Sequence, residues 1–357
     1  MKRIVVKIGS NVLTGTDKSI DRNVMSALVD QVAVLRQKGW QVILVSSGAV
    51  ACGRSMLRIK AKLDSVEQRQ LYSAVGQARL MGMYQDMFSE KGIITGQVLT
   101  MKESFSTRRE YLNQRSCMEV MLSCGVIPIV NENDTISVTE LMFTDNDELS
   151  GLVATMMDAQ QLVILSNVDG IYNGNPDDPG TSVIREIKPD DDISCYIGTV
   201  KSGFGRGGMQ TKYSIARKVA SEGVRVTIAN GKRGNILTDL ILKDGADVPH
   251  SVFVPSKDKA SSFRKWIANS QGFAKGNVRT DADAARILKG KNAASLLPVG
   301  VTAVEGDFEE GDIIAVLDPN GKRIAVGVSS YSSAEARACI GKHDMRPLIH
   351  YDSLFIE

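Results

Sequence analysis

The strongest constraint on the fold of this 357-residue chain is a regular alternation of short apolar runs with amphipathic stretches over residues 3–243. Apolar spacing of the helical kind predicts helices at 21–38, 147–157 and 209–222. The apolar runs, which predict strands, are residues 3–8, 41–45, 92–99, 126–130, 161–165 and 224–228. Since these runs are continuously apolar, they predict an α/β fold whose mainly parallel sheet is covered on both faces.

Small polar residues follow four of the predicted strands. Parallel sheets bind ligands beyond the carboxyl ends of their strands, so these residues mark the expected ligand site. They are Gly9-Ser10, Ser46-Ser47-Gly48, Asn131-Glu132-Asn133-Asp134 and Ser166-Asn167.

The sequence changes character near residues 244–276, which are rich in turn residues. Beyond them it predicts one helix at 281–288 and short strands at 300–304, 313–316 and 323–328. Pro319-Asn320-Gly321 is typical of a hairpin turn between the last two strands. We therefore expect a first domain over residues 1–250, a linker over 251–275 and a small mostly-β domain over 276–357.

Charge and hydropathy exclude several classes of protein. The 43 Lys and Arg nearly balance the 41 Asp and Glu, so the chain lacks the strong basic field of a nucleic-acid or membrane-surface binder. No apolar run approaches the roughly 18 residues that a membrane span needs. The basic start Met1-Lys2-Arg3 is followed by only three apolar residues before Lys7, too few for a signal peptide.

Cysteine and histidine usage narrows the chemistry. The five cysteines are an odd number without a Cys-x-x-Cys pair, which favours a reducing, cytoplasmic compartment over a disulfide framework or a zinc knuckle. All three histidines lie at position 250 or later. A site within the first 249 residues is therefore not built on histidine acid–base chemistry.

A glycine-rich stretch leads into one of the predicted helices. Ser202 to Gly208 holds four glycines, and Met209-Gln210-Thr211-Lys212 opens the helix. Glycine backbones and a helix N-terminus can bind phosphate oxygens, with Lys212 in the first turn. The alternative is a surface loop. No Gly-x-x-x-x-Gly-Lys-Ser/Thr motif occurs, so the chain is not a Walker-type nucleotide binder.

Two further features fit a phosphate site. Lys7 lies within the apolar first strand just before Gly9, where it is either a snorkelling lysine or a lysine that faces phosphate. Asp145-Asn146-Asp147-Glu148 opens a helix, where acidic residues also match the helix dipole. Taken together, these features indicate phosphoryl transfer, with carboxylates that hold the two lysines or help to organise Mg²⁺. An acceptor carboxylate would need no general base, since it is ionised at pH 7.

The ordered set of motifs resembles the amino acid kinase superfamily, and within it the branch that phosphorylates glutamate in the first step of proline biosynthesis. The resemblance covers the first domain nearly end to end. The matching stretches are Val5-Val6-Lys7-Ile8-Gly9-Ser10, Ser46-Ser47-Gly48-Ala49-Val50, Ala74-Val75-Gly76-Gln77, Arg108-x-x-Tyr111-Leu112-Asn113, Asn131-Glu132-Asn133-Asp134, Asp145-Asn146-Asp147 and Gly207-Gly208-Met209-x-Thr211-Lys212. An amino acid kinase-like α/β sandwich is the fold it implies.

The C-terminal region is similar to a PUA domain, which many members of that branch carry. The stretches that carry this resemblance are Ser295-Leu296-Leu297-Pro298, Gly311-Asp312 and Ile324-Ala325-x-Gly327. PUA domains often bind RNA, but residues 276–357 contain 9 Lys and Arg against 12 Asp and Glu, a net charge of −3. Because phosphate neutralisation wants the opposite sign, a structural or regulatory role is the better expectation.

The resemblance implies a role for each motif residue. Lys7 and Lys212 would stabilise charge on the transferring phosphoryl group, and Asp147 would hold both lysines. Glutamate would be bound by Ser47, Asp134 and Asn146. ATP, with Mg²⁺, would be bound by Lys7, Ser166, Asn167, Arg206, Gly207, Gly208, Met209, Gln210, Thr211 and Lys212.

The resemblance also implies an inhibitor and an oligomeric state, and the sequence departs from the family pattern at one pair of residues. Proline would inhibit by feedback, and the chain would assemble as a homodimer or homotetramer. Ser166-Asn167 stands where the family has Thr-Asp. This pair keeps the hydroxyl and an acceptor oxygen but loses a charge, so we expect nucleotide binding to survive.

Two other functions remain as alternatives at this stage. One is a sister phosphotransferase of the same superfamily that acts on aspartate, acetylglutamate, carbamate or uridylate. The PUA-like region is the feature against it. The other is an RNA-binding protein that uses the C-terminal region, which the acidic balance of that region and the presence of Lys7 and Lys212 disfavour.

Overall fold

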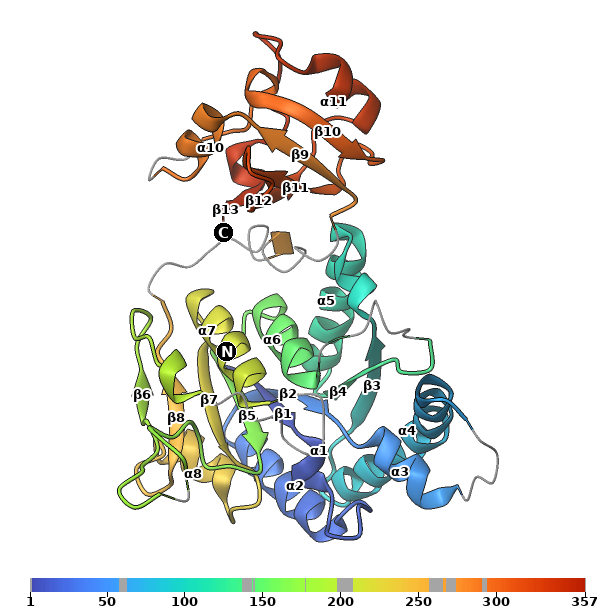
Figure 1. The fold of residues 1–357 in the computed structure, drawn as a ribbon. Helices are drawn as coiled ribbons and strands as arrows, with labels where there is room; N and C mark the ends of the chain where they lie inside the picture. The colour runs from blue at the N-terminus through green and yellow to red at the C-terminus, as the bar shows by residue number, and fades with distance from the viewer. Residues whose placement is uncertain are drawn as a thin grey trace. The chain divides into compact units, whose positions relative to one another are not determined.

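The computed structural model divides into two compact units, Met1–Lys102 with Gln114–Lys259 and Glu103–Asn113 with Ala260–Glu357. Figure 1 shows the elements of both units. The structure describes residues 2–57, 63–136, 143, 145–176, 178–197, 208–256, 266–267, 274–290 and 294–356.

The first unit is built on an eight-stranded sheet in the order β3-β4-β2-β1-β5-β7-β8-β6. Among the described strands of this sheet, only β7 and β8 pair antiparallel, so the expected mainly parallel sheet is confirmed. Its strands are β1 (Lys2–Ile8), β2 (Trp40–Ser46), β3 (Thr95–Thr100), β4 (Ile127–Glu132), β5 (Gln161–Ser166), β6 (Glu186–Ile187), β7 (Arg225–Asn230) and β8 (His250–Phe253).

Helices cover both faces of this sheet, with α2, α4 and α8 on one side and α6 and α7 on the other (Figure 1). The core beneath α2 contains Val6, Leu28, Val42 and Leu80, which are fully or almost fully buried. The helices are α1 (Ser10–Leu13), α2 (Arg22–Gln37), α3 (Ala49–Met56), α4 (Ser65–Ser89), α6 (Asn146–Met156), α7 (Met209–Ser221) and α8 (Ile236–Leu242), with the 3-10 turn η2 (Ser194–Tyr196). The 3-10 turn η1 (Lys102–Phe105) and helix α5 (Arg108–Ser123) are divided between the two units, because Glu103–Asn113 belongs to the second.

The second unit carries a five-stranded sheet in the order β10-β9-β11-β12-β13 around its own core. The hairpin expected at Pro319-Asn320-Gly321 joins the antiparallel pair β11 and β12. The mostly-β character predicted for this region is thus confirmed. Its elements are β9 (Gly276–Thr280), α10 (Ala282–Leu288), η4 (Pro298–Gly300), β10 (Val301–Gly306), β11 (Ile313–Leu317), β12 (Arg323–Val328), α11 (Ser333–Cys339), η5 (Tyr351–Ser353) and β13 (Leu354–Ile356).

Local sequence sets the ends of the predicted helices. The side chain of Asp21 accepts hydrogen bonds from the backbone N–H groups of Asn23 and Val24, which starts α2. The helix stops before Gly39, whose φ of +81° suits glycine. In the part of the chain that the structure describes, no helix is both long and apolar enough to cross a membrane.

Candidate active site

The polar residues that follow β1, β2, β4 and β5 come together because these strands are parallel neighbours. Ile8 lies in register with Ser46 on β2 and with Leu165 on β5. Strand β2 pairs with one edge of β1, and β5, which comes later in the chain, pairs with the opposite edge of β1. Such a switch point leaves a crevice at the carboxyl ends of the strands, and the residues below lie there.

Asp147 joins the two lysines that the sequence analysis singled out. Lys7 Nζ lies 2.5 Å from Asp147 Oδ1, and Lys212 Nζ lies 2.9 Å from Oδ2. All three side chains are buried, with Asp147 fully inaccessible. Burial alone would raise the pKa of Asp147, but the two ammonium groups outweigh burial and hold this pKa below its usual value. The result is a cluster of net charge +1 with a fixed spacing between its cations.

Asp145 lies beside this cluster and starts α6. Its Oδ1 accepts hydrogen bonds from the backbone N–H groups of Asp147 and Glu148. Its Oδ2 is buried and has no hydrogen-bond partner among the described residues. Burial and the charge of Asp147 raise the pKa of Asp145 from 3.8 to about 6, although Lys7 and Lys212 oppose that rise. In the sequence alone, Asp145 has no assigned role, because an acidic residue before a helix also serves as a simple cap.

The expected nucleotide residues fall at two element ends. Ser166 is buried at the end of β5, and Asn167, the next residue, is exposed. Gly208 is the N-cap of α7, so Lys212 is the fourth residue of that helix. Arg206 and Gly207, expected to bind ATP, lie outside the described residues.

A pocket of about 480 Å³ opens at the same edge of the sheet. Ser47, Asp134 and Asn146, the three residues expected to bind glutamate, all line it. Asn146 Nδ2 donates to Ser47 Oγ at 2.9 Å and to Asn131 Oδ1 at 3.0 Å. These contacts tie the ends of β2 and β4 to the first turn of α6. A pocket of this size with a few fixed polar groups suits a small polar ligand.

Helix α4 contributes pocket residues that the sequence analysis missed. Arg69 Nη2 donates to Glu132 Oε2 at 2.8 Å and also to Asp134 Oδ1. Ser73 Oγ donates to Asp134 Oδ2 at 3.0 Å. The available signal was a capping box at the start of this helix, in which Asp64 and Glu67 cap each other's backbone.

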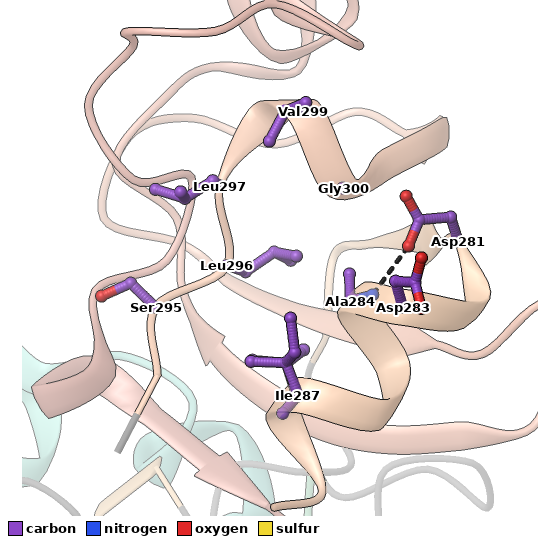
Figure 2. Close-up of a pocket in the computed structure, with 10 residues that line it drawn as sticks. Asp281, Asp283, Ala284, Ile287, Ser295, Leu296, Leu297, Val299 and Gly300 are labelled. Carbon is purple, nitrogen blue, oxygen red and sulfur yellow. Dashed lines mark hydrogen bonds between the residues drawn. The ribbon is translucent and has the colours of Figure 1, made fainter. Parts of the chain in front are cut away.

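A second pocket, of about 240 Å³, lies in the C-terminal unit between α10 and the segment before β10 (Figure 2). Its walls are mostly apolar, with Ile287, Leu296 and Val299 among them. The charged residues of the lining are Asp281 and Asp283, and no lysine or arginine belongs to it. Arg286 pairs with Asp283 from outside the lining, and a lining that holds carboxylates and no cation of its own disfavours a phosphate backbone.

Protein-family models match both units. The model of the amino acid kinase family matches residues 2–230, and that of the PUA domain matches residues 276–348. No group of three or more His, Cys, Asp and Glu side chains that could hold a metal ion occurs within the described ranges.

Curated relatives match over the full length. A glutamate 5-kinase of Bacteroides thetaiotaomicron is 60% identical over 355 residues, which is 99% of this chain and 98% of that protein. A glutamate 5-kinase of Chlorobaculum tepidum is 44% identical over 357 residues, 99% of this chain and 97% of that protein.

Among solved structures, a carbamate kinase from Giardia lamblia bound to AMP-PNP superimposes with a TM-score of 0.51. It is 17% identical and covers 71% of this chain and 99% of its own, so it supports the fold alone. The full-length relatives and the family models carry the assignment further: the chain belongs to the amino acid kinase family, and within it to the glutamate 5-kinases.

Proposed function

We propose that this protein transfers the γ-phosphoryl group of ATP to the side-chain carboxylate of L-glutamate, the first step of proline biosynthesis. The full-length relatives named glutamate 5-kinase support the reaction and the substrate. The observation that carries the mechanism is Asp147 held between Lys7 and Lys212, next to a pocket that three proposed glutamate ligands line.

The acceptor binds in the pocket at the carboxyl ends of β2 and β4. Asp134 attracts the α-ammonium group of glutamate through its negative charge. Ser47 and Asn146 offer a hydroxyl and an amide to the carboxylates of the substrate, and their mutual hydrogen bond fixes both. A buried polar site that matches each charge of its ligand rejects analogues that lack one of them.

ATP binds beside the acceptor, between the end of β5 and the start of α7. Ser166, Asn167 and the segment from Arg206 to Lys212 hold the nucleotide, and the N-terminus of α7 faces the phosphates. ATP enters as its Mg²⁺ complex, in which the metal belongs to the substrate and neutralises phosphate charge.

The reaction is an in-line displacement at phosphorus. An oxygen of the glutamate side-chain carboxylate forms the new O–P bond as the bond to the β-phosphate oxygen breaks, which yields γ-glutamyl phosphate and ADP. Since that carboxylate is already ionised at pH 7, no base has to remove a proton. Lys7 and Lys212 stabilise the charge that spreads over the transferring group, and Asp147 keeps their spacing during the step.

Further proposals concern the setting of the enzyme. The domain bounds 1–250 and 276–357, with a linker at 251–275, stay a prediction. Proline shares the α-carboxylate and amino group of glutamate, so we propose that it inhibits at or beside the acceptor pocket. We also propose a homodimer or homotetramer in the cytoplasm, where the five cysteines would remain reduced.

Trapping the acyl phosphate tests the choice of acceptor. The enzyme would be incubated with Mg²⁺, ATP and hydroxylamine together with glutamate, aspartate or N-acetylglutamate, and the hydroxamate measured. We expect hydroxamate from glutamate alone, and less of it when proline is added. Product from another acceptor but none from glutamate would contradict the assigned substrate and leave the roles of Lys7 and Lys212 standing.

A further inference from the structure

Two members of a three-residue ionic cluster on one wall of the acceptor pocket have no role in the mechanism so far. The cluster joins Arg69 of α4 to Glu132 and Asp134 at the end of β4. The two carboxylates are buried, at 5% and 9% exposure, while the Arg69 side chain keeps 21% of its surface exposed. Of the three residues, only Asp134 has a proposed contact with substrate.

Every oxygen of the two carboxylates is engaged by the protein itself. Arg69 binds one oxygen of each. The other oxygen of Glu132 accepts the backbone N–H of Phe143 at 3.1 Å, and the other oxygen of Asp134 accepts the Ser73 hydroxyl at 3.0 Å. Arg69 thus compensates two buried negative charges that lie so close together that one of its nitrogens contacts both.

The cluster also connects the elements that hold the other glutamate ligands. Glu132 binds α4 through Arg69 and the segment before α6 through Phe143. Phe143 lies three residues before Asn146, whose amide in turn contacts Ser47. A shift of Glu132 would therefore move both the Asp134 side and the Asn146 side of the pocket.

We propose that Arg69 and Glu132 are positioning residues for glutamate: they set the position of Asp134 and the net charge around it, so that Asp134 receives the α-ammonium group of the acceptor. This inference rests on the proposed function. Without Arg69, the two carboxylates lose the cation that they share and repel each other, so Asp134 leaves its position. This displacement weakens glutamate binding and leaves the ATP side unaffected.

Four variants separate positioning from general support of the fold. Arg69→Met removes the charge, and Arg69→Lys keeps it. Arg69→Met with Glu132→Gln removes the charge imbalance while it retains an acceptor for the Phe143 N–H. Gln70→Met is the matched control, because Gln70 ties the same helix to the backbone of Thr135 without a charge.

The readouts are KM for glutamate, KM for ATP and kcat. We expect Arg69→Met to raise KM for glutamate about tenfold or more, with KM for ATP changed less than about twofold and kcat less than about threefold. In Arg69→Lys and in the double variant, the rise in KM for glutamate should be less than about half of the rise in Arg69→Met, compared as logarithms of KM. The control Gln70→Met should match wild type. If Arg69→Met does not fold, the other two variants carry the comparison.

The outcomes that contradict the positioning role differ from the outcome that contradicts the proposed function. Equal rises in both KM values, or no recovery in Arg69→Lys and in the double variant, would overturn the positioning role. Wild-type enzyme that forms no hydroxamate from glutamate would overturn the proposed function itself. Wild-type turnover of glutamate together with an unchanged Arg69→Met would overturn only the inference about this cluster.

Discussion

Asp147 determines where the two lysines can act. A fully buried carboxylate is stable only when it is paired, and here each of its oxygens contacts one ammonium group. The same contacts hold the two ammonium groups on either side of one carboxylate at the crevice. A single residue therefore explains why two lysines that lie 205 positions apart in the chain share one site.

Replacement of Lys212 tests its part in the transition state. We predict that Lys212→Ala lowers kcat by about 10²–10³-fold, the usual effect of losing one charge-stabilising group, with a much smaller change in substrate KM. Asp147 keeps its ion pair with Lys7, so the protein should remain folded. Steady-state kinetics and a thermal unfolding curve measure both effects. Turnover close to wild type would remove Lys212 from the mechanism.

The raised pKa of Asp145 predicts a stability difference that depends on pH. The pKa of Asp145 is about 6 in the folded protein and 3.8 in the unfolded chain. Between these two pH values, the folded protein holds a proton on Asp145 that the unfolded chain has released. The contribution of Asp145 to stability is therefore greatest below pH 4 and is lost as the pH rises through 6.

Asp145→Asn should remove this dependence, because asparagine stays neutral and still caps α6. We predict that the variant is more stable than wild type above pH 6, by up to about 3 kcal/mol, and that the difference shrinks towards pH 4. Chemical denaturation at several pH values measures it. A difference that stays constant from pH 4 to pH 7 would contradict the assigned burial of this carboxylate.

At the scale of elements, the crossing of α3 and α4 sets one wall of the acceptor pocket. A Cβ atom on Gly76 would lie 1.8 Å from the carbonyl oxygen of Ala49, and one on Gly53 would lie 2.0 Å from that of Tyr72. The two backbones approach this closely only because both positions are glycine. Their contact places the N-terminus of α3, next to Ser47, against the helix that carries Arg69.

Two substitutions on α4 compare this contact with simple helix propensity. Gly76→Ala should push the helices apart, which lowers the free energy of unfolding by about 1–3 kcal/mol and raises KM for glutamate. Gly82→Ala is the control, since no atom lies within 4 Å of its added Cβ and alanine favours the helix by up to about 1 kcal/mol. Equal effects of the two changes on KM would argue against the crossing as a determinant of the pocket.

The elements that could be predicted from sequence are those whose pattern is local. Helix α2 has apolar residues on one face, Asp21 as its cap and Gly39 beyond its end, so its bounds follow from neighbours in the chain. Helix α4 escaped prediction because its buried face includes Ser73, Gly76 and Gln77, which are not apolar side chains. These three residues interrupt the apolar stripe by which an amphipathic helix is recognised in a sequence.

The same distinction holds for the site. Lys7 stood out because a lysine within an apolar strand needs a partner, and the structure pairs it with Asp147. Arg69 did not stand out, because it lies in the polar stretch Ser65-Val66-Glu67-Gln68-Arg69-Gln70, where a charged residue is expected on a solvent-exposed helix face. Only the fold brings it to Glu132 and Asp134, more than 60 residues away.

At the scale of the whole molecule, residues 276–357 add an acidic PUA region to a kinase. The net charge of −3 of this region, and a pocket whose charged lining residues are Asp281 and Asp283, oppose binding to a phosphate backbone. We predict that the full-length protein retains no tRNA in a filter-binding assay at about 150 mM salt. Retention that weakens steeply with added salt would instead reveal a basic surface elsewhere on the chain.

The central claim is that a carboxylate oxygen of glutamate attacks the γ-phosphorus of ATP, and isotope transfer tests it most directly. Glutamate labelled with ¹⁸O in its side-chain carboxylate would be turned over with ATP, Mg²⁺ and hydroxylamine, and the released phosphate analysed by ³¹P NMR. Hydroxylamine attacks the acyl carbon, so we expect released phosphate that carries one ¹⁸O atom per turnover. Phosphate without the label would show that water, and not glutamate, attacks ATP, and would contradict the proposed attack by the glutamate carboxylate.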